Sequence, residues 1–134
     1  MTAKLIKITA NKKQLALIIK SGFQTKKNQF LTSKNNPLQL GILKFPKNYL
    51  VKPHYHRQIQ KTTHKNQEFI YLVSGKIQVT FYHHQQKIQT TTLNSGDILL
   101  QLAGGHSFKM LKPSQLITIK QGPYKGTKKE KSFI

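Results

Sequence analysis

Two apolar runs joined by a Ser-Gly turn make up residues 68–82, EFIYLVSGKIQVTFY. In the second run Ile77, Val79 and Phe81 alternate with polar or amphipathic side chains. Successive side chains of a β-strand point to opposite faces, so this alternation predicts a strand with one buried face. A Ser-Gly pair between two such runs is a turn signal. The stretch therefore predicts two consecutive strands with Gly75 at the turn.

The same pattern recurs along the chain at a spacing of roughly ten residues. Turn signals such as Asn-Ser-Gly and Pro-Ser separate the runs, and none of them sustains a helical period beyond about three turns. Many short strands at this spacing predict an all-β sandwich or barrel. The expected strands are Leu5–Thr9, Leu15–Lys20, Leu38–Phe45, Glu68–Ser74, Lys76–Tyr82, Lys87–Leu93, Asp97–Leu102, His106–Leu111 and Gln115–Gln121.

Length and composition narrow the class of protein. A chain of 134 residues fits one domain, 1–134, with a core of its own. The absence of cysteine excludes disulfide frameworks, zinc ribbons and thiol catalysis. The longest apolar run, residues 15–19, is far shorter than the roughly 20 residues of a membrane span and too short for a signal-peptide core. We therefore expect a cytoplasmic protein without a membrane segment.

The charge is strongly positive, with 23 basic and three acidic side chains and a net charge of +20. Such a charge would favour binding to a nucleic acid, an anionic membrane or an anionic substrate. Arg57 is the only arginine, however, and the lysines are scattered along the whole chain rather than gathered in one arm. This distribution favours a solvated, compositionally biased surface. Nucleic-acid binding is the less favoured alternative.

The three acidic residues have different expected roles. Asp97 follows an Asn-Ser-Gly turn at the start of a strand, where a short carboxylate accepts backbone N–H bonds. Glu130 lies in a lysine-rich tail as a solvated countercharge. Glu68 shares a strand face with Ile70, so we expect it to point inward. A buried carboxylate needs a compensating cation.

Three histidines could supply the ligands of that cation. His54 and His56 lie two positions apart, which places both on one side of an extended segment. His106 opens another predicted strand after a Gly-Gly turn. Three imidazoles and Glu68 would make a site for a divalent transition metal with open coordination positions. His64, four residues before Glu68, is an alternative to one member of the His54–His56 pair.

Other polar side chains complete the inventory. Tyr55, Arg57 and Tyr82 are candidate substrate-binding residues, because tyrosine hydroxyls can hydrogen-bond a polar ligand and a guanidinium can pair with a carboxylate or phosphate. His83 and His84 precede two glutamines, which indicates a hairpin tip rather than a site.

These motifs together resemble the two-part signature of the cupin superfamily. The first part is Pro53-His54-Tyr55-His56 followed by Glu68 and Gly75, and the second runs from Gly96-Asp97 through Gly104 to His106. The second part and the following KQGPY at 120–124 are similar to a group of small single-domain cupins, some of which are found among sugar and surface-polysaccharide biosynthesis functions. The resemblance covers about Leu38 to Tyr124.

The resemblance implies a fold, a metal and an assembly. The fold would be an antiparallel β-barrel of jelly-roll topology, with N-terminal strands in 1–37 exchanged in a homodimer, a barrel core at 38–124 and a basic tail at 125–134. The implied ligands of an Fe, Mn, Ni or Zn ion are His54, His56, Glu68 and His106. The chain departs from the family pattern in having eleven residues between His56 and Glu68, a longer gap than usual. Leu102 and Met110 replace the usual Pro and Asn.

Two functions follow as expectations. The first is a metal-binding cupin that binds or transforms a small polar metabolite such as a sugar derivative, as an isomerase, an epimerase or an Fe(II) oxygenase. The second is a small-ligand-binding cupin that uses no metal and catalyses no reaction. The absence of a second inward carboxylate excludes a paired-acid glycosidase mechanism.

Overall fold

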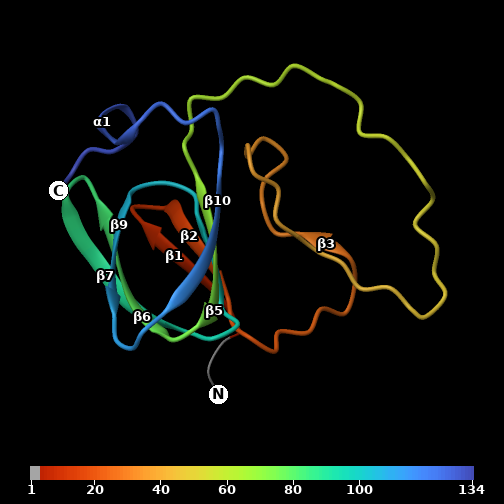
Figure 1. Ribbon diagram of the computed structural model, residues 1–134, viewed down its shortest axis with the longest axis horizontal. Helices are drawn as coiled ribbons and strands as arrows, with labels where there is room; N and C mark the ends of the chain where they lie inside the picture. The colour runs from red at the N-terminus through yellow and green to blue at the C-terminus, as the bar shows by residue number, and fades with distance from the viewer. Residues whose placement is uncertain (1–3) are drawn as a thin grey trace. The chain divides into compact units, whose positions relative to one another are not determined.

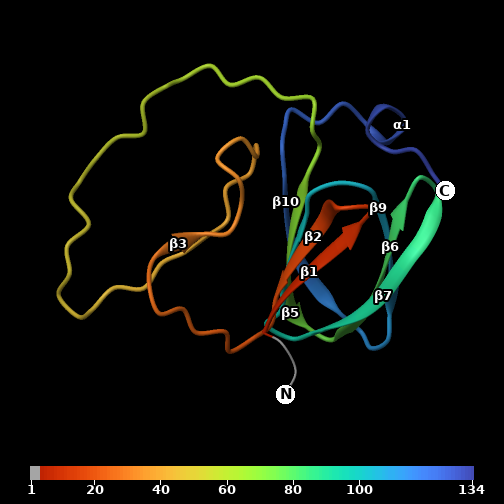
Figure 2. The same cartoon turned by 180° about the vertical axis from the view of Figure 1, so that it is seen from behind.

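The computed structural model describes residues 4–134, and it confirms the predicted all-β architecture (Figures 1 and 2). Residues 4–23 and 66–134 form one compact unit, and residues 24–65 form a second. The strands are β1 (Leu5–Ala10), β2 (Lys13–Ile19), β3 (Gln29–Phe30), β4 (Gly41–Ile42), β5 (Glu68–Ser74), β6 (Lys76–His83), β7 (Gln86–Asn94), β8 (Ile98–Gln101), β9 (Gly105–Met110) and β10 (Gln115–Lys120). A single helical turn, α1 (Thr127–Glu130), follows them, and no helix among the described residues could cross a membrane.

Two antiparallel sheets build the first unit. One has the strand order β1-β2-β8-β5-β10 and the other the order β7-β6-β9. The chain passes from one sheet to the other at Gly75, whose φ of 103° is a conformation that L side chains rarely adopt. Both sheets are open in the described part of the chain, because the edge strands β1, β10, β7 and β9 each pair with only one other strand. The closed jelly-roll barrel is therefore not confirmed.

One hydrophobic core lies between these sheets. Most strands of both sheets contribute alternate residues to it, as the two-residue period of a strand requires, whereas β2 is buried on both faces from Leu15 to Ile19. The alternation read from residues 76–82 is confirmed, since Ile77, Val79 and Phe81 are fully buried. The core residues are Ile8, Ala10, Leu15, Ala16, Ile18, Ile70, Leu72, Ile77, Val79, Phe81, Leu93 and Leu99.

Tight hairpins connect two of the strand pairs. The loop between β6 and β7 consists of His84 and Gln85, with φ values of 50° and 64°. Two consecutive positive φ angles are those of a type I′ turn, whose twist matches that of the flanking strands. The prediction that His83 and His84 lie at a hairpin tip is confirmed.

Asp97 has the structural role that the sequence predicts. Its carboxylate accepts hydrogen bonds from the backbone nitrogen of Asn94 (2.7 Å) and from that of Ser21 (2.8 Å). It also pairs with Nζ of Lys20 at 2.6 Å. Asp97 is 1% exposed, so these contacts are shielded from water. They tie the end of β2 to the turn that leads into β8.

Residues 24–65 contain little regular structure. Their only ladder joins Gln29 to Ile42 and Phe30 to Gly41. The predicted strand at 38–45 is therefore reduced to the two residues of β4. From residue 43 onward the sequence has few alternating apolar positions and many Lys, Asn, Gln and His side chains. It offers no apolar face that would stabilise a longer strand.

Candidate functional site

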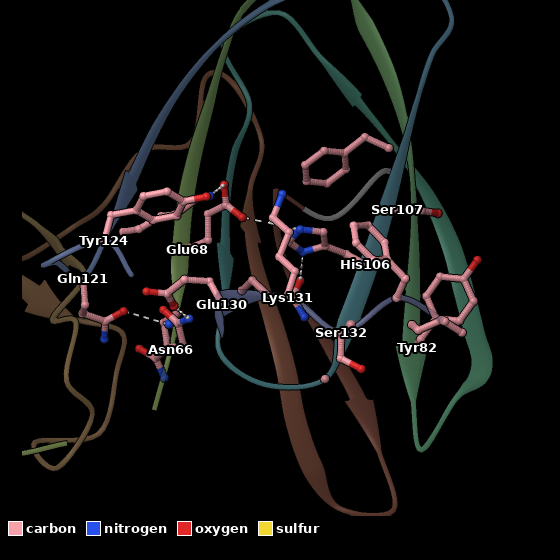
Figure 3. A pocket seen from close by; sticks show the side chains of 18 of the residues that line it. Asn66, Glu68, Tyr82, His106, Ser107, Gln121, Tyr124, Glu130, Lys131 and Ser132 are labelled. Carbon is pink, nitrogen blue, oxygen red and sulfur yellow. Dashed lines mark hydrogen bonds and ion pairs between the residues drawn. The ribbon is translucent and has the colours of Figure 1, made fainter. Parts of the chain in front are cut away.

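A pocket of about 890 Å³ opens on the unit formed by residues 4–23 and 66–134 (Figure 3). Cross-strand register places its central residues. Glu68 opens β5 and lies opposite Gln101 of β8 and Lys120 of β10. His106 comes from β9 of the other sheet, opposite Phe81. The pocket therefore receives polar groups from both sheets.

Glu68 and His106 face each other in this pocket, as Figure 3 shows. Oε1 of Glu68 lies 3.4 Å from Nε2 of His106. The other carboxylate oxygen, Oε2, accepts a hydrogen bond of 2.6 Å from the Thr118 hydroxyl and lies 3.9 Å from Nζ of Lys120. Both oxygens of the carboxylate thus have polar neighbours.

Gln101 sets the protonation pattern of the His106 ring. Its Nε2 donates to the carbonyl oxygen of Ala103, so its Oε1 is the atom that meets Nδ1 of His106 at 3.2 Å. An amide oxygen can only accept, so Nδ1 carries a proton. Gln101 is 4% exposed and is held firmly, and the ring also stacks on Phe108 with centroids 4.5 Å apart.

This arrangement directs Nε2 of His106 and Oε1 of Glu68 toward one point. In the neutral ring Nε2 would present a lone pair to a carboxylate oxygen, which is unfavourable. A proton on Nε2, or a cation between the two atoms, removes that repulsion. The pair is therefore suited to proton transfer or to cation binding.

The pKa of Glu68 is lowered from its ordinary value of 4.5. Burial raises this pKa, but hydrogen bonds from His106 and Thr118 and the charges of His106 and Lys120 together outweigh burial. The carboxylate form of Glu68 is consequently favoured in the folded protein.

We expect this shift to appear in the pH dependence of stability. Because the folded pKa lies below the unfolded one, Glu68 stabilises the fold above about pH 4.5, and the contribution is lost as pH falls through the folded pKa. Urea unfolding of wild type and Glu68→Gln between pH 7 and pH 3 measures it. The difference in free energy of unfolding between the two proteins should narrow below pH 4.5. Thr118→Val removes one hydrogen bond to Glu68 and should make this pH dependence smaller. Parallel curves for wild type and Glu68→Gln would contradict it.

The sequence-predicted site residues fall in both units. Glu68, His106 and Tyr82 line the pocket of the first unit. The remaining candidates, His54, Tyr55, His56, Arg57 and His64, belong to residues 24–65 and are exposed. The rings of His54 and His56 lie 5.1 Å apart, which agrees with their predicted placement on one side of the segment. Among residues 4–134, no group of three or more His, Asp or Glu side chains could hold a metal ion.

Several pocket residues were not predicted from the sequence. Gln67 is 2% exposed and donates from Nε2 to the carbonyl oxygen of Leu102 at 3.1 Å. Its backbone nitrogen donates to Oε1 of Gln121 at 2.8 Å. Of these pocket residues, only Gln101 could have been identified from the sequence, because it is a polar residue at the end of the apolar run Ile98–Leu100.

No protein-family model matches the chain, and no similar protein is found among curated proteins or solved structures.

Proposed function

We propose that the protein binds a small polar metabolite in this pocket and that Glu68 and His106 transfer a proton on it. The observation that carries the proposal is the 3.4 Å approach of the two side chains, with Nδ1 of His106 engaged by Gln101. The resemblance to small cupins associated with sugar and polysaccharide biosynthesis supports a sugar derivative as the metabolite, and a cupin-type jelly roll as the fold. A pocket of about 890 Å³ has room for such a molecule.

The reaction that suits this pair is isomerisation or epimerisation of a hydroxy-carbonyl compound. Nε2 of His106 would take a proton from the carbon next to the carbonyl, breaking the C–H bond and leaving an enediol-type intermediate. The carboxylate of Glu68 stabilises the imidazolium that forms. Delivery of the proton to the opposite face of the same carbon completes the epimerisation. Delivery to the neighbouring carbon, while the hydroxyl proton passes to the former carbonyl oxygen, completes the isomerisation, and in both cases the ring returns to its neutral form.

Deuterium exchange tests this function directly. The protein is incubated in D₂O with a panel of ketose and aldose phosphates, and NMR follows loss of the C–H signal next to the carbonyl. At least one compound should exchange faster than in buffer, with or without EDTA. A panel that shows no enzyme-dependent exchange would remove the proton-transfer proposal.

A metal-dependent form of the site is the second candidate. Oε1 of Glu68 and Nε2 of His106 are suitable ligands, and the bond from Nδ1 to Gln101 is the kind of outer contact that orients a metal-bound imidazole. A bound divalent ion would act there as a Lewis acid or, as Fe(II), would activate oxygen.

Elemental analysis of protein purified without a His tag separates the two candidates. The metal-dependent form predicts about one ion per chain, lost in Glu68→Ala and in His106→Ala. His84→Ala, at the exposed hairpin tip, should keep the ion and serves as the control. Protein without metal, or variants that retain it, would exclude this candidate, and exchange that persists in EDTA would support metal-free proton transfer.

A further inference from the structure

A buried hydrogen-bond donor in the pocket has no partner. Nε2 of Gln121 is inaccessible to solvent and meets no acceptor among residues 4–134. The orientation of this amide is set, because Oε1 accepts the bond from the backbone nitrogen of Gln67. Gln121 lines the pocket, and Figure 3 shows its side chain there. A buried donor left without an acceptor destabilises a fold, so its retention calls for an explanation.

The only other such donor among the described residues is Nε2 of Gln14. Gln14 lies on β2 and is not part of the pocket lining. Gln14 is therefore a matched control, since it has the same side chain as Gln121 and its Nε2 also lacks an acceptor. Gln121, unlike Gln14, lines the pocket described above, in which a ligand could supply the acceptor.

The carboxylates of the pocket already have hydrogen-bond donors or cations beside them. Glu68 already has Thr118 and His106 as neighbours. Glu130, which the sequence predicts as a solvated countercharge, instead lines this pocket as a second carboxylate. Its two oxygens accept hydrogen bonds from Nδ2 of Asn66 at 2.8 Å and from a backbone nitrogen at 3.1 Å.

The cations of the pocket are less well matched. Nζ of Lys131, which lines the same pocket, has no ion pair or hydrogen bond in the described part of the chain. Lys120 lies no closer than 3.9 Å to Oε2 of Glu68. The unsatisfied groups of the pocket are therefore a neutral amide donor, that of Gln121, and the cation of Lys131.

We propose that Gln121 anchors an oxyanion of the bound metabolite, a carboxylate or a phosphate, by donating a hydrogen bond from Nε2. Lys131 supplies positive charge at the same pocket and favours an anionic over a neutral ligand. This inference rests on the proposed function, because it names the chemical class of the metabolite and the residue that selects it. It assigns Gln121 to binding and not to the proton transfer.

Calorimetric titration tests it with three probes that share a sugar-like framework: glucose 6-phosphate, gluconate and glucose. Work in 150 mM salt suppresses non-specific binding to the basic surface. Wild type should bind one of the two oxyanions more tightly than glucose. Gln121→Glu keeps the acceptor for Gln67 but replaces the donor with an oxygen, and it should weaken that binding by about 10- to 100-fold. Gln14→Glu makes the same charge change outside the pocket and should stay within about twofold of wild type.

The outcomes separate this inference from the proposed function. Equal affinity of wild type and Gln121→Glu overturns the anchoring role, as does a wild type that prefers glucose or binds none of the probes. If deuterium exchange nevertheless depends on His106, the proposed function stands and only the oxyanion anchor fails. A shift of the Gln121 side-chain amide signals in NMR on adding the bound oxyanion, absent on adding glucose, supports the contact itself.

Discussion

Replacing Asp97 with Ala is expected to lower the free energy of unfolding by about 3 to 5 kcal/mol, the range observed when one partner of a buried ion pair is removed. The substitution leaves Nζ of Lys20 with the carbonyl oxygen of Thr92 as its remaining contact, at 3.1 Å. It also removes the acceptor of two backbone N–H groups, those of Ser21 and Asn94. Urea unfolding at pH 7 measures the loss.

Companion variants show which part of this network matters. Asp97→Asn keeps an acceptor oxygen but removes the charge, so it should destabilise less than Asp97→Ala. Adding Lys20→Met to Asp97→Asn should recover part of the loss, since it removes the unpaired ammonium group. A decrease below about 1 kcal/mol for Asp97→Ala would show that the network contributes no more than an exposed pair.

The strands of the first unit could be predicted because their signal is local. The alternation of Ile77, Val79 and Phe81 needs only the two-residue period of a strand, and these residues are buried as expected. The role of Asp97 was also readable, because a carboxylate after a turn meets nearby backbone nitrogens. The hydrogen bond from Ser21, 76 residues away, was not readable from the sequence.

The candidate site was predictable only in part, for the same reason. Glu68 could be placed on an inward strand face and His106 at the start of another strand, and the structure brings them together. Their polar neighbours depend on strand order, since Gln101 and Lys120 become neighbours of Glu68 only because β8 and β10 flank β5. A sequence pattern carries little information on such order. The unpartnered donor of Gln121 is a property of the folded chain alone.

His106→Gln is expected to reduce deuterium exchange on the responsive sugar phosphate by about 10²- to 10⁴-fold, the usual contribution of a positioned acid–base group. Glutamine occupies a similar volume and can still hydrogen-bond Gln101, but it cannot hold the transferred proton. The loss should appear in the rate at saturating ligand more than in the half-saturating concentration, because the proton moves only in the chemical step.

Two further variants decide whether Glu68 and His106 act as one unit. Glu68→Gln should also slow exchange, and the double variant should be no slower than His106→Gln alone, since residues that act together have non-additive effects. His83→Gln makes the same substitution at the hairpin tip and should exchange at the wild-type rate. The unfolding midpoint of each variant confirms that it folds. Exchange that survives in His106→Gln, or additive losses in the double variant, would mean that the 3.4 Å pair is structural and that another group moves the proton.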